Sequence, residues 1–242
     1  MVQGDRVTEE VLEGMEGEGV AVSPWCPRHP AHTCPNSVVL ASAATGSRTI
    51  VHTNLGLPEL TLKDLQAVPL DGLAWVHLEG RNRTNLLAML DYLANQDSVK
   101  VSVEVEKVGR GFEDFIPLAD VVFVSKDVAM AHGCRDKEAA IAYFRPRLRA
   151  GASLVVAWGE AGAAAWSPGG PVTSPAFPPA LGVIDTLGAG DTFNATVVPP
   201  TRTLALAQVI GCLAAGLDLA TSVRTGCQVR PGARCPVQGE AR

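Results

Sequence analysis

The stretch Val183–Asn194, VIDTLGAGDTFN, places two glycines and an alanine between two aspartates, just where a helix is about to begin. Its first two residues are typical of the end of a strand, and Thr192 onward is predicted to open a helix. Glycines let backbone N–H groups approach a ligand closely, because no Cβ stands in the way. A helix N-terminus adds unpaired donors and a positive dipole end. The loop Gly188–Gly190 is therefore suited to hold a phosphate in transit.

Asp191 stands at the edge of this loop, beside whatever hydroxyl would attack the phosphate. A carboxylate in that place can accept the hydroxyl proton, as a general base must. The alternative is an ordinary strand-to-helix turn with Asp191 as its N-cap, which would be preferred for a bare G-x-G-D. The full string D-T-x-G-A-G-D-x-F is longer and more specific. The chain contains no G-x-x-x-x-G-K-[ST], so it is not a P-loop protein.

Strands and helices alternate through the middle of the chain. Apolar runs predict strands at 73–78, 99–105, 121–124 and 154–157, and helices at 85–94, 112–118 and 137–148. This alternation predicts a mostly parallel sheet covered by helices, an α/β layer fold. Before it, the pattern predicts a helix from about Thr8, a strand at 20–22, a hairpin of 37–42 with 48–52, and a short helix at 61–67.

Composition and charge narrow the class of protein. The 242 residues are 47% hydrophobic, enough for one domain with a sizeable core or at most two small ones. The net charge is −5, and no basic block suggests nucleic acid. The longest apolar stretch, 204–220, carries Gln208 and Asp218, so we interpret it as a buried helix pair and not a membrane span. The acidic N-terminus has no apolar run, which predicts no secretory signal, a cytoplasmic location and reduced thiols.

One cluster of metal-binding residue types occurs near the N-terminus. The segment CPRHPAHTC packs together Cys26, His29, His32 and Cys34. A zinc site is one interpretation, but the spacing does not fit a standard finger and the prolines favour a plain loop. We therefore expect no protein-bound metal here.

The D-T-x-G-A-G-D-x-F string is the signature of the ribokinase-like (PfkB) sugar kinases, and the chain resembles that family, its fructose kinases in particular. Further matching strings, in the family's order, are GSRTI (46–50), HLEGRN (77–82), VSVEVEK (101–107), DVVFVSKDVA (120–129), AWGEAGA (157–163) and AFPP (176–179). The resemblance implies a three-layer α/β/α sandwich around a mostly parallel sheet. It divides the chain into a divergent segment, 1–36, and a partial kinase domain, 37–242, whose residues 37–52 form a clasp hairpin.

The resemblance also implies roles for matched residues. Asp191 would be the catalytic base at the sugar hydroxyl. The anion hole would consist of Gly188, Ala189 and Gly190. The nucleotide-binding residues would be Arg48, Gly159, Glu160, Ala161, Gly162 and Cys227. Without the resemblance, Arg48 would be interpreted as an exposed hairpin arginine, residues 159–162 as a turn, and Cys227 as a core cysteine.

Two further places are open to more than one interpretation. Arg81 and Asn82 follow a strand end, where ligands collect in open α/β sheets, so they could contact sugar or phosphate. An ordinary helix start with surface polar groups is equally compatible. Glu104 and Glu106 flank another strand end, where one of them could help place Mg²⁺ through water. Alternatively, Glu104 is buried and hydrogen-bonded.

The chain departs from the family at several points. The family's first strands, which carry an aspartate for the sugar, have no counterpart, and its N-x-x-E motif falls at Ser125–Val128 without matching at either end. These departures indicate an incomplete version of such a kinase. Because phosphoryl transfer depends on positioning, a site without its sugar clamps is expected to lose much of its rate.

The resemblance implies a function and its partners. The complete kinase would use ATP, with Mg²⁺ bound mainly through the nucleotide, to phosphorylate the 1-hydroxyl of fructose. The clasp hairpin would form a homodimer. Two alternatives stay open: an inactive isoform acting as a binding or dimerisation module, and another family specificity, such as a ribokinase- or adenosine-kinase-like enzyme.

Overall fold

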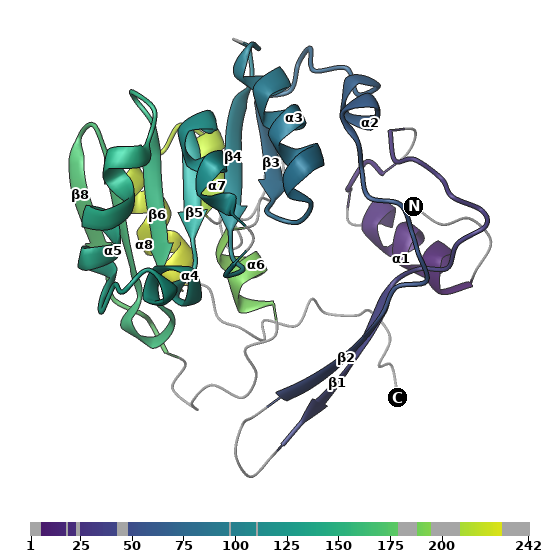
Figure 1. The fold of residues 1–242 in the computed structure, drawn as a ribbon, viewed down its shortest axis with the longest axis horizontal. Coiled ribbons are helices and arrows are strands. Elements are labelled where there is room, and N and C mark those ends of the chain that lie inside the picture. Colours follow the sequence, from purple (N-terminus) through teal and green to yellow (C-terminus); the bar gives the residue numbers. More distant parts are fainter. Residues whose placement is uncertain are drawn as a thin grey trace. The chain divides into compact units, whose positions relative to one another are not determined.

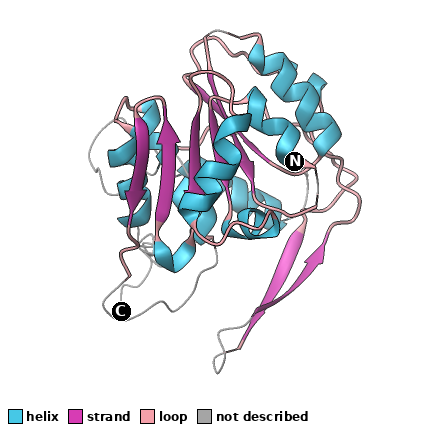
Figure 2. Ribbon diagram, turned by 60° about the vertical axis from the view of Figure 1, so that its left-hand side comes forward, coloured by secondary structure: helices cyan, strands magenta, loops and turns pink. Residues whose placement is uncertain are grey.

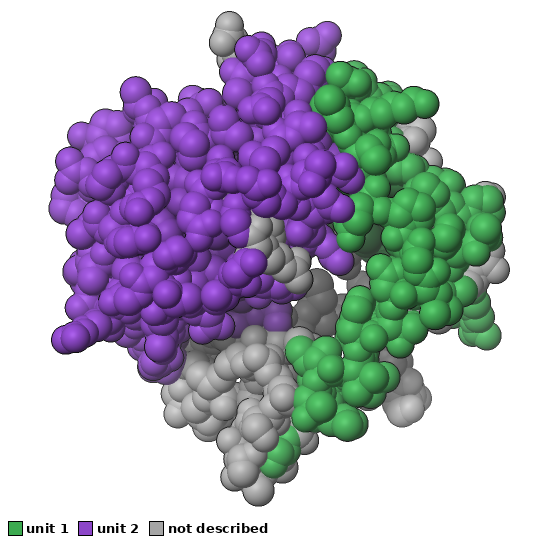
Figure 3. All heavy atoms as spheres, in the orientation of Figure 1, with its two compact units in different colours: residues 1–69 green, residues 70–242 purple. Residues whose placement is uncertain are grey.

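The chain divides into two units, residues 1–69 and residues 70–242, in a computed structural model (Figure 3). The structure describes residues 6–17, 19–22, 25–42, 48–96, 98–109, 111–178, 188–194 and 209–228. The predicted strand end at Val183–Ile184 lies outside these ranges, as do Cys235 and the first residues of the apolar stretch 204–220.

Six strands form one sheet in the second unit, in the order β3-β4-β5-β6-β7-β8 (Figure 1). They are β3 (Trp75–Glu79), β4 (Lys100–Val105), β5 (Val121–Val124), β6 (Ser153–Ala157), β7 (Ala163–Ser167) and β8 (Gly170–Ser174). The first four strands run parallel, and β7 and β8 are antiparallel to their neighbours. All four residues of β5 are buried, as expected where helices cover both faces of a parallel sheet.

Helices lie on both faces of this sheet (Figures 1 and 2). The unit contains α3 (Arg83–Ala94), η1 (Phe112–Leu118), α4 (Lys126–Ala131), α5 (Lys137–Phe144), η2 (Arg145–Arg147), η3 (Gly159–Ala161), α6 (Ala189–Asn194), α7 (Val209–Ala214) and α8 (Leu219–Gln228). Phe123 and Val155, which pair across β5 and β6, pack in one apolar cluster with Phe193, Val209 and Val223. Helices α6, α7 and α8 therefore cover that face. Because side chains alternate along a strand, Val122 and Val124 point to the opposite face.

The helix that follows each of two parallel strands begins at a capping residue. Asn82, after β3, accepts a hydrogen bond from the backbone N–H of Asn85, and Ser125, after β5, accepts one from Val128. Both helices thus start at the carboxyl edge of the sheet. The α/β layer fold predicted from the sequence is confirmed.

Several predicted elements differ in the structure. The helix predicted over 137–148 is α-helical only to Phe144, because Pro146 has no N–H and the chain tightens into η2. Strands β7 and β8 were not predicted. AAAWS of β7 has no β-branched residue and GPVTS of β8 begins with Gly and Pro, so pairing of β7 with β6 and of β8 with β7, more than local propensity, makes them strands.

The first unit contains α1 (Arg6–Gly17), the antiparallel strands β1 (Asn36–Ala41) and β2 (Arg48–Thr53), and α2 (Leu62–Gln66). The predicted hairpin is confirmed, with Val39 opposite Ile50. Thr61 and Asp64 form a capping box at the start of α2, as the predicted short helix requires. The strand predicted at 20–22 is wrong: these residues pair with no strand among the described residues, and Val22 is buried instead.

Candidate active site

The turn before α6 has the conformation that the glycine-rich sequence requires. Gly188 has φ 69°, in the left-handed region that favours glycine, and its carbonyl accepts a hydrogen bond from Thr192 at 2.8 Å. Helix α6 therefore begins at Ala189, three residues earlier than predicted, and Asp191 lies inside its first turn, not at the N-cap. The first N–H groups of a helix have no intrahelical acceptor. The predicted anion hole of Gly188, Ala189 and Gly190 would use these N–H donors, and it stays a prediction.

The other side of α6 is fixed in the interior. Phe193 is 9% exposed and belongs to the apolar cluster beneath α7 and α8. A Cβ on Gly226 of α8 would lie 2.9 Å from the Phe193 ring, so only glycine lets the two helices approach this closely. Cys227 follows Gly226 on α8. The predicted catalytic turn and the predicted nucleotide-binding cysteine are thus on helices that touch.

Glu104 connects β4 to α6. Its Oε1 accepts a hydrogen bond from Nδ2 of Asn194 at 2.6 Å. Desolvation, together with the negative charges of Glu106, Asp191 and Glu79, raises the pKa of Glu104 to about 7, although the Asn194 bond lowers it. Of the two interpretations of Glu104, the structure shows the hydrogen-bonded one, with the side chain partly buried.

A second polar side chain with a shifted pKa lies one strand away. His77 of β3 shares the hydroxyl of Ser102 with Trp75: Nδ1 of His77 lies 2.7 Å from Ser102 Oγ, and Nε1 of Trp75 donates to the same oxygen at 2.8 Å. The His77 ring also packs edge-on against Phe123. Burial lowers the pKa of His77 to about 4, and the charge of Asp191 acts in the opposite direction. Asp191 is therefore near enough to influence ionisable groups on both β3 and β4.

The predicted nucleotide loop follows β6. The turn η3 is closed by hydrogen bonds between Trp158 N–H and the Gly162 carbonyl, at 2.8 Å, and between Gly162 N–H and the Gly159 carbonyl, at 2.9 Å. Gly162 has φ 81°, and a Cβ there would overlap the carbonyl of Ser174. A side chain at this position is therefore excluded both by backbone conformation and by contact with β8.

Two lysines hold this turn from the neighbouring helices. Nζ of Lys126, at the start of α4, lies 2.8 Å from the Glu160 carboxylate. Nζ of Lys137, at the start of α5, donates to the carbonyl of Ala161. Two positive charges thus lie at the turn that the sequence assigned to the nucleotide.

Cys227 is close to the same turn. Burial raises the pKa of its thiol, while a hydrogen bond with Ser174 and the charge of Lys137 lower it. Because Ser174 also contacts Gly162, the structure brings Cys227 and the turn at 159–162 together, as their shared predicted role requires.

The remaining predicted residues are less closely grouped. Arg81 lies just beyond β3, with its guanidinium 3.8 Å from Glu79, and is exposed. Asn82 serves as the N-cap of α3 through its side-chain oxygen. Arg48 is the first residue of β2 in the first unit, opposite Ala41, so it belongs to a different unit from the other site residues.

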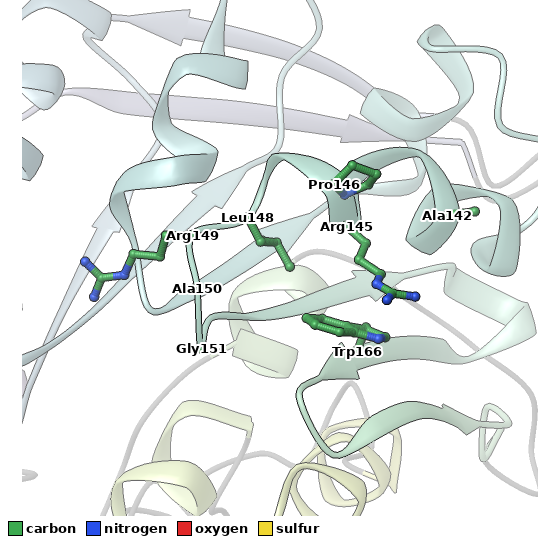
Figure 4. Close-up of a pocket in the computed structure, with 8 residues that line it drawn as sticks. All are labelled: Ala142, Arg145, Pro146, Leu148, Arg149, Ala150, Gly151 and Trp166. Carbon is green, nitrogen blue, oxygen red and sulfur yellow. The ribbon is translucent and has the colours of Figure 1, made fainter.

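Two other features of the described residues bear on ligands. No group of three His, Cys, Asp or Glu side chains in the described ranges is arranged to hold a metal ion, including Cys26, His29, His32 and Cys34. A hollow of about 510 Å³ lies beside α5, where the Arg145 guanidinium stacks 4.6 Å from the Trp166 ring (Figure 4). It contains none of the predicted site residues.

Sequence reasoning did not identify His77 or the two lysines as part of this region. Alternation places Ser102 and Glu104 on one face of β4, since residues two apart on a strand share a face. Only the register that pairs His77 with Ser102 adds His77 to that face. Asn194 follows Asp191 by three residues, which puts both on one side of a helix. No local signal marks Lys126 or Lys137, because their contacts depend on the tertiary fold.

Comparison with known proteins agrees with this arrangement. The pfkB family carbohydrate kinase profile matches residues 1–229, and the chain belongs to this family of sugar kinases. Ketohexokinase from mouse is 38% identical over 213 residues, which cover 85% of this chain and 67% of the mouse protein. The predicted resemblance to the ketohexokinase-like members of the family is therefore confirmed, and with it the class of phosphotransferase that acts on a sugar hydroxyl.

Solved structures share the fold. A PfkB protein from Polaromonas sp. JS666 superposes with a TM-score of 0.70 at 20% identity, covering 94% of this chain and 75% of that chain. A putative ribokinase II from E. coli gives 0.69 at 15% identity, with 94% and 72% covered. These likenesses confirm the ribokinase-like fold class. Separately, among the described residues, none of the helices has the length and apolar character that crossing a membrane requires.

Proposed function

We propose that this chain is an ATP-dependent kinase that phosphorylates the 1-hydroxyl of fructose, yielding fructose 1-phosphate and ADP. One observation carries the proposal: the exposed Asp191 lies in the first turn of α6, three residues after the left-handed Gly188, and its charge reaches Glu104 and His77 on the sheet. The identity to mouse ketohexokinase supports the choice of sugar.

In the proposed reaction, Asp191 accepts the proton of the 1-hydroxyl as that oxygen forms its bond to the transferred phosphorus. The N–H groups of Gly188, Ala189 and Gly190 donate hydrogen bonds to the oxygens of the phosphoryl group, where negative charge develops. Arg81 and Asn82, at the end of β3, orient the sugar or the phosphate. The Oδ1 of Asn82 is engaged as a helix cap, so its NH₂ group is the part that would meet a ligand.

The turn at 159–162 suits a nucleotide. Its first glycine, Gly159, has nothing within 4 Å of where a Cβ would stand, so a ligand could approach the backbone there. Lys126, paired with Glu160, and Lys137 lie beside the turn. We assign Gly159, Glu160, Ala161, Gly162 and Cys227 to nucleotide binding, with Arg48 reaching the phosphates. ATP would supply the phosphoryl group and bring Mg²⁺ with it.

The test is ADP release from the purified chain with ATP, Mg²⁺ and fructose. Turnover should disappear in Asp191→Asn and persist in Asp91→Asn, which removes the charge of an exposed aspartate on α3. Turnover that survives Asp191→Asn would refute the base assignment. Equal turnover with ribose or adenosine would instead support another family specificity.

The clasp hairpin, β1 and β2, supports a proposed homodimer. Val38, Leu40, Ile50 and Val51 are each more than half exposed within the described residues. Register places them on both faces of the two-stranded ribbon, and such surfaces are usually covered by a partner. If the chain has no turnover, this hairpin favours the second candidate function, a binding module that pairs with another kinase chain.

A further inference from the structure

Asp191 and Asn194 share one face of α6, since residues three apart on a helix are neighbours. Asp191 is exposed, whereas Asn194 is only 6% exposed. A single helical turn therefore separates the carboxylate that faces solvent from an amide held inside the unit.

Phe193 and Asn194 are the buried side chains of α6. The contacts of Phe193 are apolar, and apolar burial is non-directional. By contrast, the bond from Asn194 to Glu104 is short, at 2.6 Å, and hydrogen bonds depend on angle as well as distance. This bond can therefore fix the rotation of α6 against β4, while the packing of Phe193 against Gly226 sets the distance of α6 from α8.

Glu104 lies among other acidic groups. Glu79 stands opposite it in the β3–β4 register, and Glu106 and Asp191 also act on it. All three disfavour a negative charge on Glu104. A carboxyl group keeps its carbonyl acceptor whether or not it carries a proton, so the bond from Asn194 survives in either state.

We infer that Glu104 is a positioning residue for phosphoryl transfer: through Asn194 it fixes the rotation of α6 and thereby the direction of Asp191. The inference rests on the proposed role of Asp191 and deepens it. Glu104 acts as a hydrogen-bond acceptor one turn below the base, and not as a charge or a metal ligand.

A pair of substitutions of similar size tests this role. Glu104→Gln keeps an acceptor for Asn194, and Glu104→Met keeps the length of the side chain without one. We expect Glu104→Gln to retain kcat within about threefold, and Glu104→Met to lower kcat by about 10- to 100-fold, the usual cost of a slightly misplaced group. KM for ATP and fructose should change little. Glu13→Gln and Glu13→Met, on the exposed side of α1, are the matched controls.

Two outcomes would overturn the inference. Equal losses in Glu104→Gln and Glu104→Met would mean that the charge matters, through a metal or the substrate. Wild-type kcat in Glu104→Met would mean that the bond to Asn194 does not position the base.

A double-mutant cycle provides a second check. Glu104→Met combined with Asn194→Leu should be no slower than the slower single variant, because both remove the same interaction. Losses in kcat that multiply would show that the two residues act separately, contrary to the inference.

Failure of the proposed function would be seen separately, as absent turnover in the wild-type chain. Amide hydrogen exchange in α6 then decides the positioning role. Faster exchange over residues 189–194 in Glu104→Met, but not in Glu104→Gln, would support it, and equal exchange in all three proteins would overturn it.

Discussion

Phe193 of α6 lies against the bare backbone of Gly226 in α8, where a Cβ would stand 2.9 Å from the aromatic ring and 2.7 Å from a methyl group of Val209. This contact determines how closely the helix that carries Asp191 approaches the helix that carries Cys227. The side chains of Phe193 and Val209 and the backbone of Gly226 meet here without room for one further carbon atom.

Gly226→Ala should therefore destabilise the protein by about 1–3 kcal/mol, the typical cost of overpacking. Because α6 must shift, kcat should fall as well. Urea unfolding and ADP release measure the two effects. Gly14→Ala, where nothing lies within 4 Å, should instead be neutral or stabilising by up to about 1 kcal/mol. Unchanged stability in Gly226→Ala would mean that the helices are less tightly packed than described.

Glu104 should make stability fall as pH rises. Its pKa of about 7 in the folded protein lies above the ordinary value of 4.5, so the folded state holds a proton that the unfolded state releases. Stability is then lost progressively between pH 4.5 and 7, by up to about 3 kcal/mol. Glu104→Gln should remove this loss and be more stable than the wild type at pH 8 but not at pH 4. Parallel stability curves for the two proteins would contradict the prediction.

His77 should make the stability of the protein fall as pH decreases, the opposite of the effect of Glu104. Its pKa of about 4 lies below the ordinary value of 6.5, so the unfolded state takes up a proton that the folded state refuses. Stability should fall as pH decreases from 6.5 to 4, by less than the full pKa shift would give, because the His77 side chain is partly exposed to solvent. His77→Asn, which can still bond to Ser102, should unfold with less dependence on pH in that window. Chemical unfolding at pH 7 and pH 4.5 compares the variants, with His32→Asn in the other unit as control.

Gly162 is the position at which a small change should most affect nucleotide binding. Its backbone conformation alone would cost a side chain about 1–3 kcal/mol, and a methyl group would also overlap the Ser174 carbonyl. Gly162→Ala should lower the melting temperature and weaken ADP binding in calorimetry. Gly169→Ala, which would meet only Ser167 Oγ at 3.5 Å, should do neither. Wild-type ADP affinity in a folded Gly162→Ala would argue against the proposed nucleotide loop.

The clasp hairpin predicts a dimer that a single charge disrupts. Leu40→Lys places an ammonium group on an apolar strand surface, so the molar mass from light scattering should fall from that of a dimer to that of a monomer. Leu217→Lys adds the same charge at an exposed apolar residue of the second unit and should leave the mass unchanged. A wild-type chain that is already monomeric would refute the homodimer.

Elements marked by strong hydrophobic periodicity or by a long motif could be predicted from the sequence. Interactions between distant segments could not. The Val-rich parallel strands and the hairpin follow from local pattern. The sequence predicts that α6 begins at Thr192, with Gly188–Gly190 as a loop before it; in the structure the helix begins at Ala189, after the turn at Gly188. The bond between Glu104 and Asn194 joins residues 90 positions apart. The sequence indicates each of these residues weakly and their pairing not at all.

The hydroxyl of Ser102 has one further consequence. The indole of Trp75 can only donate, so it occupies a lone pair of Ser102 Oγ. Ser102 is fully buried, and its oxygen keeps a second lone pair and one hydrogen, so its bond at 2.7 Å to Nδ1 of His77 can run in either direction. When Ser102 donates, the imidazole carries its proton on Nε2 and presents a donor to any group on its far side. When Ser102 accepts, Nε2 becomes an acceptor there.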